Sequence, residues 1–185
     1  MTNKKGPPAW RKHKAEYGPT LPFFQVRYDW MENPRNQQVL KRIILETGDW
    51  VNIVAVTPEQ KVVVVRQFRF GTAKVSTEIP GGLIDPGEDS KTAAMRELKE
   101  ETGYTSDKWT YLGSVEANPA FLNNVCHQWL AEDVKQTSDI DLGDGEDITI
   151  DTLTLAEIKA EMKVGTFRHS LALLALAHVF DIRSG

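Results

Sequence analysis

Residues 82–104 read GLIDPGEDSKTAAMRELKEETGY, and this stretch indicates a loop that leads directly into a helix. Its first part is rich in glycine and proline, which punctuate turns. Its second part, residues 92–102, is rich in alanine, leucine, lysine and glutamate, which favour helices. Asp89 or Ser90 is placed to cap the start of this helix, and Gly103 is placed to cap its end.

Three carboxylates lie within five positions of the predicted helix. Residues three and four apart share a helix face, so Glu97 and Glu101 lie one turn apart with Glu100 beside them. Like charges this close repel by roughly a few tenths of a kcal/mol per pair, so we expect a cation to hold them. Ligand sets made only of oxygen suit Mg²⁺ or Mn²⁺. A solvated acidic face is the alternative, but the fixed spacing of glycine and Arg96 around the carboxylates disfavours it.

Every fixed position of this stretch matches the signature of the Nudix hydrolases, and the chain resembles that family. The resemblance implies hydrolysis of a nucleoside diphosphate linked to another group, with a divalent metal. It assigns the metal-binding and catalytic carboxylates to Glu97, Glu100 and Glu101. It further implies that Arg96 pairs with a motif carboxylate and orients it. The carbonyl oxygen of Gly81 is expected as an additional metal ligand.

Sequence outside the motif resembles the ADP-ribose and nucleoside diphosphate sugar pyrophosphatases within this family. The run VRQFRFG at Val65–Gly71 precedes TEIPGGLID, and the resemblance implies that Arg69 and Glu78 bind substrate. Pro119 occupies the place of a proline that marks the ADP-ribose group. The surrounding NPAFLNN departs from the more common version with Pro-Gly, which leaves the sugar open.

The loop over residues 137–147 is acidic and contains glycine, as a mobile lid over a metal site would. The family resemblance places a catalytic base just before the last strand, which selects Glu146. Asp144 is the alternative in this loop. If neither residue acts, the role returns to the motif helix, with Glu100 as the first candidate.

The expected activity is therefore metal-dependent hydrolysis of the pyrophosphate bond of ADP-ribose or a nucleoside diphosphate sugar. The products would be a nucleoside monophosphate and a sugar phosphate. A dinucleoside polyphosphate, a damaged nucleotide or a capped RNA is an alternative substrate. A further alternative is a non-catalytic sensor of ADP-ribose, although such proteins usually lose motif carboxylates and this chain retains them.

The order of predicted elements indicates an α+β protein, because strands are followed by helices with one helix interposed. Apolar, β-branched runs flanking Pro58-Glu59-Gln60 predict a central hairpin. The resemblance implies an αβα sandwich with a mixed sheet, to which an N-terminal β segment is added. Further strands are expected within residues 22–50, 74–79, 109–118, 125–134 and 148–155, and helices at Leu155–Lys163 and Phe167–Ile182.

Three regions are expected along the chain: a flexible tail at residues 1–9, a strand region at 10–50 and a Nudix domain at 51–185. The strand region exceeds what a minimal sandwich needs and is expected to form a homodimer. It contains Trp30 and Trp50, either of which could stack on a nucleobase. Packing in the core or in the dimer is the alternative role for both.

Composition limits the partners. The chain has 185 residues, a net charge of −4 and a pI of about 5.6, so we expect a small nucleotide substrate and no nucleic acid polymer or membrane. The single Cys126 excludes an intrachain disulfide, and we expect it to be a small buried residue. The N-terminal residues have no apolar segment of the secretory type, so a cytoplasmic location is expected.

Overall fold

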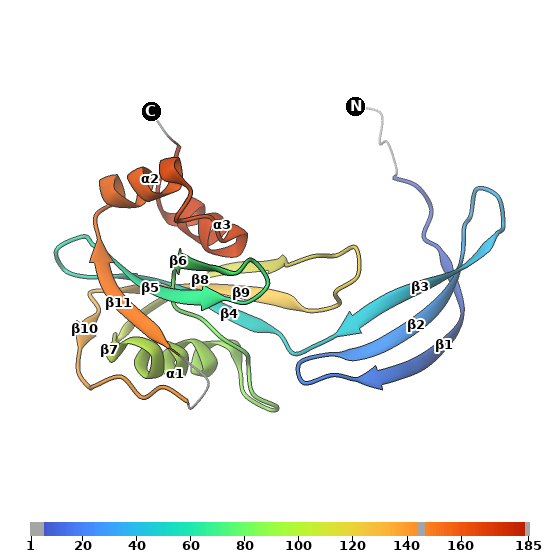
Figure 1. The fold of residues 1–185 in the computed structure, drawn as a ribbon, viewed down its shortest axis with the longest axis horizontal. Coiled ribbons are helices and arrows are strands. Elements are labelled where there is room, and N and C mark those ends of the chain that lie inside the picture. Colours follow the sequence, from blue (N-terminus) through green and yellow to red (C-terminus); the bar gives the residue numbers. More distant parts are fainter. Residues whose placement is uncertain (1–5, 144–146, 184–185) are drawn as a thin grey trace. The chain divides into compact units, whose positions relative to one another are not determined.

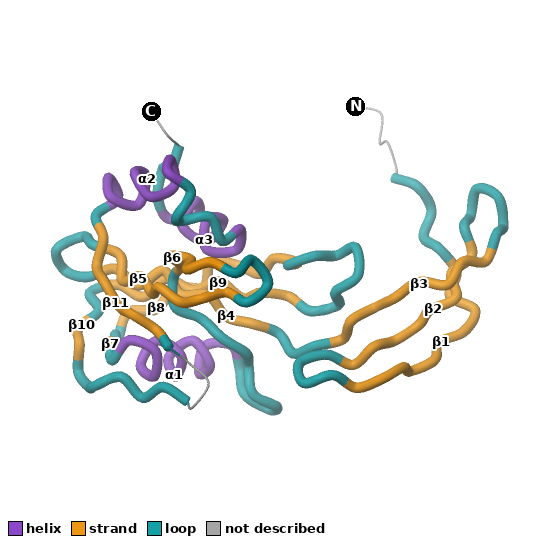
Figure 2. The backbone as a smooth tube through the Cα atoms, viewed as in Figure 1, coloured by secondary structure: helices purple, strands orange, loops and turns teal. Residues whose placement is uncertain are grey.

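The structure is a computed structural model that describes residues 6–143 and 147–183, and these residues form two compact units. The first unit is the described part of Met1–Thr47 together with Asn118–Asn124. The second is Gly48–Ala117 together with the described part of Val125–Gly185. The first unit consists of strands and loops, and every described helix belongs to the second (Figure 2).

The first unit contains an antiparallel sheet with the order β1–β2–β3. Its strands are β1 (Arg11–Thr20), β2 (Gln25–Glu32) and β3 (Val39–Glu46). The strands expected within residues 22–50 are confirmed, whereas β1 lies in the part of the expected strand region, residues 10–50, for which no individual strand was predicted. Its sequence, RKHKAEYGPT, is polar and lacks the alternation that identifies a half-buried strand. Backbone pairing with β2, rather than burial, holds it in place.

Charged pairs lie within this first sheet. The buried carboxylate of Asp29 accepts a hydrogen bond of 2.9 Å from Arg27 Nε and lies 3.6 Å from Lys12 Nζ. Arg27 also donates to Glu46 on β3. The large apolar side chains are less well covered, and several are exposed: Trp10, Tyr17, Leu21, Phe23, Val39 and Ile43. Among the described residues of this unit, Val26 is buried, whereas the other large apolar side chains stay at least partly exposed.

The second unit is built on a six-stranded sheet with the order β11–β5–β4–β9–β8, in which β6 also pairs with β5. Only the β4–β9 pair is parallel among the pairs of this sheet, so the sheet is mixed. Its strands are β4 (Trp50–Val56), β5 (Val62–Arg69), β6 (Lys74–Glu78), β8 (Lys108–Glu116), β9 (Val125–Glu132) and β11 (Ile148–Leu153).

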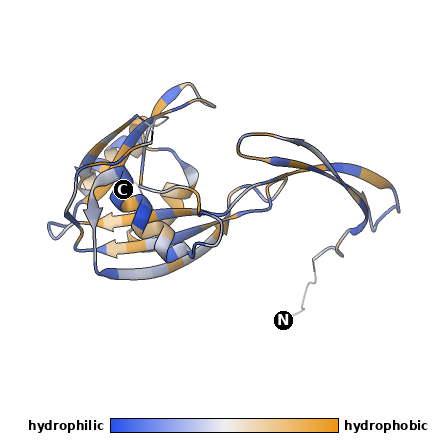
Figure 3. Cartoon of the chain, turned by 90° about the horizontal axis from the view of Figure 1, so that it is seen from below, coloured by the Kyte–Doolittle hydropathy of each residue, from blue (hydrophilic) through white to orange (hydrophobic). Residues whose placement is uncertain are grey.

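Both faces of this sheet are covered by helices (Figure 1). Because side chains alternate along a strand, Val51, Ile53 and Ala55 of β4 face one side and Val54 and Val56 face the other. The first set packs with buried residues of α1 (Ser90–Thr102). The second set packs with α2 (Leu155–Val164) and α3 (Ser170–Val179). The hydrophobic stretches of the strands are orange in Figure 3. The predicted αβα sandwich with a mixed sheet is confirmed.

The observed ends of the helices can be compared with the ends predicted from the sequence. The motif helix begins after Asp89 and ends at Gly103, as predicted. The last helix is shorter than the expected Phe167–Ile182, because Phe167 pairs with Thr77 and only after His169 does the chain become helical. A two-stranded sheet of β7 (Tyr104–Thr105) and β10 (Lys135–Gln136) was not predicted. Among the described helices, none has the length and apolar character needed to cross a membrane.

Candidate active site

The motif helix is anchored at its first turn. The Oδ1 atom of Asp89 accepts hydrogen bonds from the backbone N–H groups of Lys91 and Thr92, at 3.0 and 3.1 Å. These bonds satisfy donors that have no partner inside a helix. Ala94 and Leu98 are buried against the sheet. The apolar stripe therefore fixes the rotation of the helix, and with it the direction in which the acidic residues project.

Two glycines allow the preceding loop to lie close to both β4 and α1. A Cβ on Gly81 would lie 2.1 Å from the carbonyl oxygen of Val51, and one on Gly82 would lie 2.4 Å from the carboxylate of Glu97. The carbonyl oxygen of Gly82 accepts a hydrogen bond of 2.9 Å from Val51 N–H. The sequence needs glycine at both positions because any side chain would displace either the strand or the carboxylate.

Glu101 joins the helix to this loop. Its side chain is buried, and Oε2 accepts a hydrogen bond of 2.9 Å from the backbone N–H of Gly81. A buried carboxylate is costly unless it is hydrogen-bonded or paired with a cation. Glu101 and Gly81, both predicted as metal ligands, are thus brought together in the structure.

Arg96 is the centre of the acidic cluster. Its Nε and Nη2 atoms donate to the carboxylate of Glu88 at 3.1 and 2.9 Å. Its Nη1 atom donates to both Glu97 and Glu100, at 2.8 and 3.1 Å. The hydrogen bonds with Glu88 are the main cause that raises the pKa of Arg96, and the same bonds lower the pKa of Glu88. The guanidinium of Arg96 and the carboxylate of Glu88 therefore stay ionised together.

Glu88 is the partner that sequence reasoning missed. The resemblance implied that Arg96 orients a motif carboxylate, and the structure shows contacts with three of them. Glu88 was recognised as a fixed position of the motif, but it lies eight residues before Arg96, and no helix periodicity relates the two. Only the fold of the loop brings them together.

The chemistry of this cluster fits a hard divalent cation, because all its donors are oxygen atoms. A single nitrogen, Arg96 Nη1, already lies within hydrogen-bonding distance of oxygen atoms of both Glu97 and Glu100. These carboxylates therefore converge on a centre of positive charge. Within the described residues, however, no three acidic, histidine or cysteine side chains are grouped so as to hold a metal ion. Glu97 and Glu100 would share their oxygen atoms between a metal and Arg96.

A second arginine–carboxylate pair lies on the β5–β6 hairpin. Arg69 Nε and Nη2 donate to the two carboxylate oxygen atoms of Glu78, at 2.8 and 2.6 Å. The side chain of Arg69 is 45% exposed, whereas that of Glu78 is only 3% exposed. Burial alone would raise the pKa of Glu78, but the hydrogen bonds from Arg69, followed by the charges of His169 and Arg69, outweigh it, and the pKa is lowered. The two residues predicted to bind substrate are therefore in direct contact.

The remaining predicted residues are not all in this unit. Trp50 is half-buried at the start of β4, where it pairs with Leu83 of the motif loop. Trp30 lies on β2 of the first unit, with the ammonium groups of Lys14 and Lys41 within 4.8 and 5.2 Å of its ring centroid. Pro119 belongs to the 118–124 segment of the first unit. The predicted base Glu146 and its alternative Asp144 lie outside the described residues.

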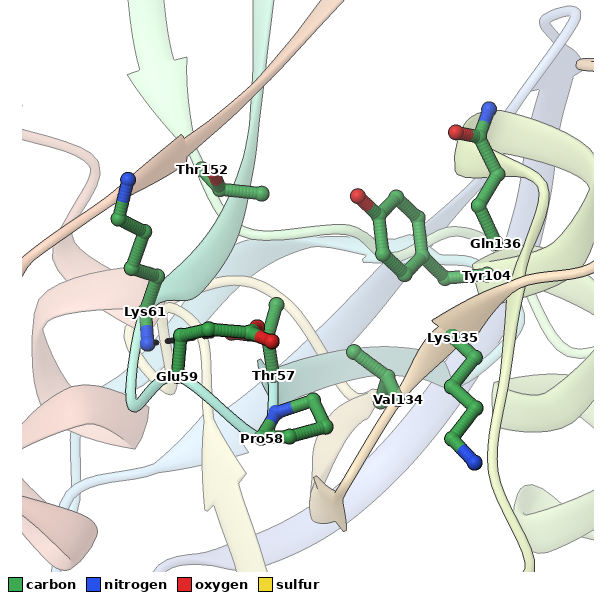
Figure 4. A pocket seen from close by; sticks show the side chains of 9 residues that line it. All are labelled: Thr57, Pro58, Glu59, Lys61, Tyr104, Val134, Lys135, Gln136 and Thr152. Carbon is green, nitrogen blue, oxygen red and sulfur yellow. Dashed lines mark hydrogen bonds between the residues drawn. The ribbon is translucent and has the colours of Figure 1, made fainter.

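A surface cavity of about 520 Å³ lies at the turn between β4 and β5, beside the small β7–β10 sheet (Figure 4). It is lined by Thr57, Pro58, Glu59, Lys61, Tyr104, Val134, Lys135, Gln136 and Thr152. None of the residues predicted to bind metal or substrate lines it. Its charged lining residues are Glu59, Lys61 and Lys135, so it contains none of the carboxylates of the motif helix.

The sequence profile of the NUDIX domain matches residues 47–173. The chain belongs to the Nudix family. This range contains the complete motif, the Arg69–Glu78 pair, α1, α2 and the beginning of α3.

Two relatives and one solved structure show where the chain is placed among Nudix proteins. It is 32% identical over 156 residues to a methanol dehydrogenase activator of Bacillus methanolicus, and the alignment covers 84% of each chain. It is 38% identical over 99 residues to the ADP-ribose pyrophosphatase of Bacillus subtilis strain 168, covering 54% of each chain. The crystal structure of an ADP compounds hydrolase has the same fold, with a TM-score of 0.82 over 95% of each chain and 24% identity.

These findings confirm the prediction of a Nudix hydrolase and the resemblance to ADP-ribose pyrophosphatases. Cys126 is buried, as expected, and burial raises the pKa of its thiol to about 12, so it is not a nucleophile at neutral pH. The individual roles assigned to the motif residues, and to Arg69 and Glu78, stay predictions.

Proposed function

We propose that this Nudix protein hydrolyses the pyrophosphate bond of ADP-ribose or a nucleoside diphosphate sugar, with the help of a divalent metal. The observation that carries the proposal is the gathering of motif carboxylates around Arg96 and Gly81 on one side of α1. The similarity to the Bacillus subtilis ADP-ribose pyrophosphatase supports the choice of substrate. The products would be a nucleoside monophosphate and a sugar phosphate.

Mg²⁺ or Mn²⁺ held by Glu97, Glu100, Glu101 and the carbonyl oxygen of Gly81 would neutralise the diphosphate and lower the pKa of a bound water. Arg96 holds the carboxylates of Glu97 and Glu100 in place through hydrogen bonds from Nη1. Through its bond to Gly81 N–H, Glu101 fixes the loop on which that carbonyl lies.

Proton transfer requires a base beside the attacking water. We assign this role to Glu146, with Asp144 as the alternative; both lie outside the described residues. If replacing Glu146 and replacing Asp144 have equally small effects on the rate, Glu100 becomes the first candidate for the base. A positioned base typically contributes a factor of about 10²–10⁴ in rate.

Substrate binding is assigned to the exposed guanidinium of Arg69, whose planar donors match phosphate oxygen atoms. Without substrate, Glu78 accepts two hydrogen bonds from this guanidinium and so orients it. Trp30 or Trp50 would stack on the nucleobase, and Pro119 would lie in the segment that distinguishes the substrate. The cytoplasmic location expected from the sequence stays a prediction.

We further propose that the protein is a homodimer. The exposed apolar side chains of the first unit form the surface that a second copy would cover, because large exposed apolar patches mark interaction sites. Light scattering at micromolar concentration tests this directly. A mass of one chain would refute the dimer without affecting the assignment of the reaction.

A substrate screen tests the activity. ADP-ribose, GDP-mannose, UDP-glucose and NADH would each be incubated with the protein and Mg²⁺, and the released nucleoside monophosphate would be measured. We expect release from ADP-ribose or a nucleotide sugar that stops when the metal is chelated. Release from a dinucleoside polyphosphate or a capped RNA alone would contradict the proposed substrate class while leaving the reaction type in place.

A second candidate function follows from the alignment with the methanol dehydrogenase activator, which covers 84% of the chain. In this case the chain would activate a dehydrogenase. The assay would add the protein, or its Glu101→Gln variant, to a purified methanol dehydrogenase. Activation by both forms would indicate a binding role, and activation by the wild type alone would make hydrolysis part of the activation.

A further inference from the structure

The buried carboxylate of Glu78 lies between two basic side chains. On one side, Arg69 donates to both of its oxygen atoms. On the other, the Nδ1 atom of His169 lies 3.7 Å from Oε2. This distance is too long for a hydrogen bond but short enough for an ion pair when the ring is protonated. His169 immediately precedes α3, and its side chain is 31% exposed.

The ring of His169 already has a partner on its own helix. Nδ1 accepts a hydrogen bond of 3.4 Å from the backbone N–H of Ala172, which makes His169 the N-cap of α3. A nitrogen that accepts carries no proton, so the ring in this state is neutral with its proton on Nε2. Burial is the main cause that lowers the pKa of His169, and the charge of Arg69 lowers it further, whereas Glu78 opposes both. In this state, Arg69 is therefore the cation that balances Glu78.

Binding of a diphosphate by Arg69 would disturb this balance. Its Nε and Nη2 atoms donate to Glu78 at 2.8 and 2.6 Å, and phosphate oxygen atoms would compete for the same guanidinium. Any displacement of Arg69 towards substrate weakens its bonds to a carboxylate that solvent barely reaches. A buried charge that loses its partner is strongly destabilised, so a substitute cation is needed.

We propose that His169 is a positioning residue which takes up a proton from solvent as a diphosphate engages Arg69, and then donates from Nδ1 to Glu78. This role rests on the proposed function. One N–H bond forms on the ring, and the Ala172 N–H loses its acceptor. Glu78 thereby keeps a cationic partner throughout, and Arg69 can turn to the phosphates without leaving an unpaired carboxylate behind.

The surroundings of the ring support this exchange. Among the described residues, the charged groups that act on His169 are Glu78 from β6 and Arg69 from β5. The neighbouring Arg168 is exposed. When the charge of Arg69 moves away, its repulsion of the protonated ring weakens, whereas the attraction of Glu78 remains. Protonation of His169 is therefore favoured. The bound state then holds more protons than the unbound state, so binding tightens as the pH falls through the raised pKa of His169.

The test measures protons taken up when the non-hydrolysable analogue α,β-methylene-ADP-ribose binds in the presence of Mg²⁺. Titration calorimetry at pH 6.5 in two buffers with different ionisation enthalpies, MES and ACES, gives this quantity. We compare the wild type with His169→Asn, because asparagine caps a helix well but cannot carry a positive charge. His178→Asn is the matched control, since His178 is exposed on the same helix. His169→Ser provides a second capping variant if the first fails to fold.

We expect the wild type and His178→Asn to take up protons on binding, and His169→Asn to take up fewer. The KM of the wild type should also fall with decreasing pH, by at most about tenfold per pH unit, the limit for one linked proton. In His169→Asn this slope should be lost while kcat is retained. Normal binding without proton uptake, or equal uptake by His169→Asn, would overturn this role alone. Failure of the wild type to bind the analogue would overturn the proposed function and this role with it.

Discussion

Two arginines in the second unit pair with carboxylates in opposite ways. Arg96 contacts Glu88, Glu97 and Glu100 and is itself only 26% exposed. Arg69 contacts Glu78, which is buried, and is itself 45% exposed. Around Arg96, carboxylates outnumber the guanidinium, so negative charge remains for a metal. Arg69 donates to the buried carboxylate of Glu78, and nearly half of the arginine side chain is exposed to solvent.

This difference separates a site for cations from a site for anions. A diphosphate needs both, because its charge must be neutralised by metal while the rest of the molecule is held in place. Arg96 acts on the carboxylates of the protein, whereas Arg69 would act on the substrate. Substitutions in the two clusters should therefore change different kinetic constants.

The largest effect is expected when the acidic cluster loses a charge. Glu101→Gln keeps a side chain that can still accept from Gly81 N–H, but it removes a charged ligand. Activity should fall by at least about a hundredfold, the scale of losing a preorganised charge at a metal site. Initial rates with saturating Mg²⁺ measure this, and Glu59→Gln, at an exposed turn, is the control. Turnover close to that of the wild type would remove Glu101 from the metal site.

The sequence was sufficient to predict features that depend on neighbouring residues. Asp89 as one of two possible N-caps, Gly103 as the C-cap and the carboxylates of the motif helix follow from composition and helix spacing. The sequence did not predict contacts between residues that are distant in the chain. Nothing in the sequence around Arg96 indicates that Glu88 is its main partner, because the loop between them has no regular periodicity.

Two misjudged elements have the same physical origin. The strand β1 is polar, and it exists because β2 offers a backbone to pair with, so no hydrophobic pattern identifies it. The last helix was predicted too long because the apolar Phe167 was counted as helical, although it bridges to Thr77 instead. In both cases a contact with another strand decides the local structure. His169 was missed for the same reason, since its importance lies in a contact with β6.

The same conservative substitution at both arginines tests the comparison itself. In Arg96→Lys, a single ammonium replaces a planar fork that serves three carboxylates, so several charge-assisted hydrogen bonds are lost. We expect the free energy of unfolding to fall by about 2 kcal/mol, the typical contribution of a hydrogen bond to a charged group. We also expect kcat to decrease more than KM changes. Urea denaturation and steady-state kinetics measure the two effects, and unchanged stability would show that Glu88 and its neighbours do not depend on Arg96.

Arg69→Lys should behave differently. Lysine keeps the positive charge beside Glu78, so stability should change little, but it cannot donate to phosphate in a bidentate manner. We expect KM to rise about tenfold with kcat largely retained, which corresponds to the loss of roughly 1.4 kcal/mol of substrate binding. Arg96→Lys serves as the matched control. If kcat fell in both variants while KM stayed unchanged, the division into a cation site and an anion site would be wrong.

The smallest effect concerns the dependence of stability on pH. Pairing with Arg69 lowers the pKa of Glu78 below its ordinary value of 4.5 in spite of burial. A carboxylate whose pKa is lower in the folded state stabilises the protein above the unfolded pKa, and this contribution is lost as the pH falls through the folded pKa. In the double variant Arg69→Gln/His169→Asn, burial acts on Glu78 without either basic neighbour, so the pKa of Glu78 should rise above that of the unfolded chain, and the sign of the contribution reverses. The variant should be less stable than the wild type at pH 7, and the difference should shrink as the pH is lowered through the range around 4.5.

Thermal unfolding between pH 3.5 and pH 7 measures this difference. The pair of Arg96 and Glu88, intact in both proteins, contributes equally and cancels. A difference in stability that stays constant over the whole range would mean that the ionisation of Glu78 does not depend on Arg69 and His169.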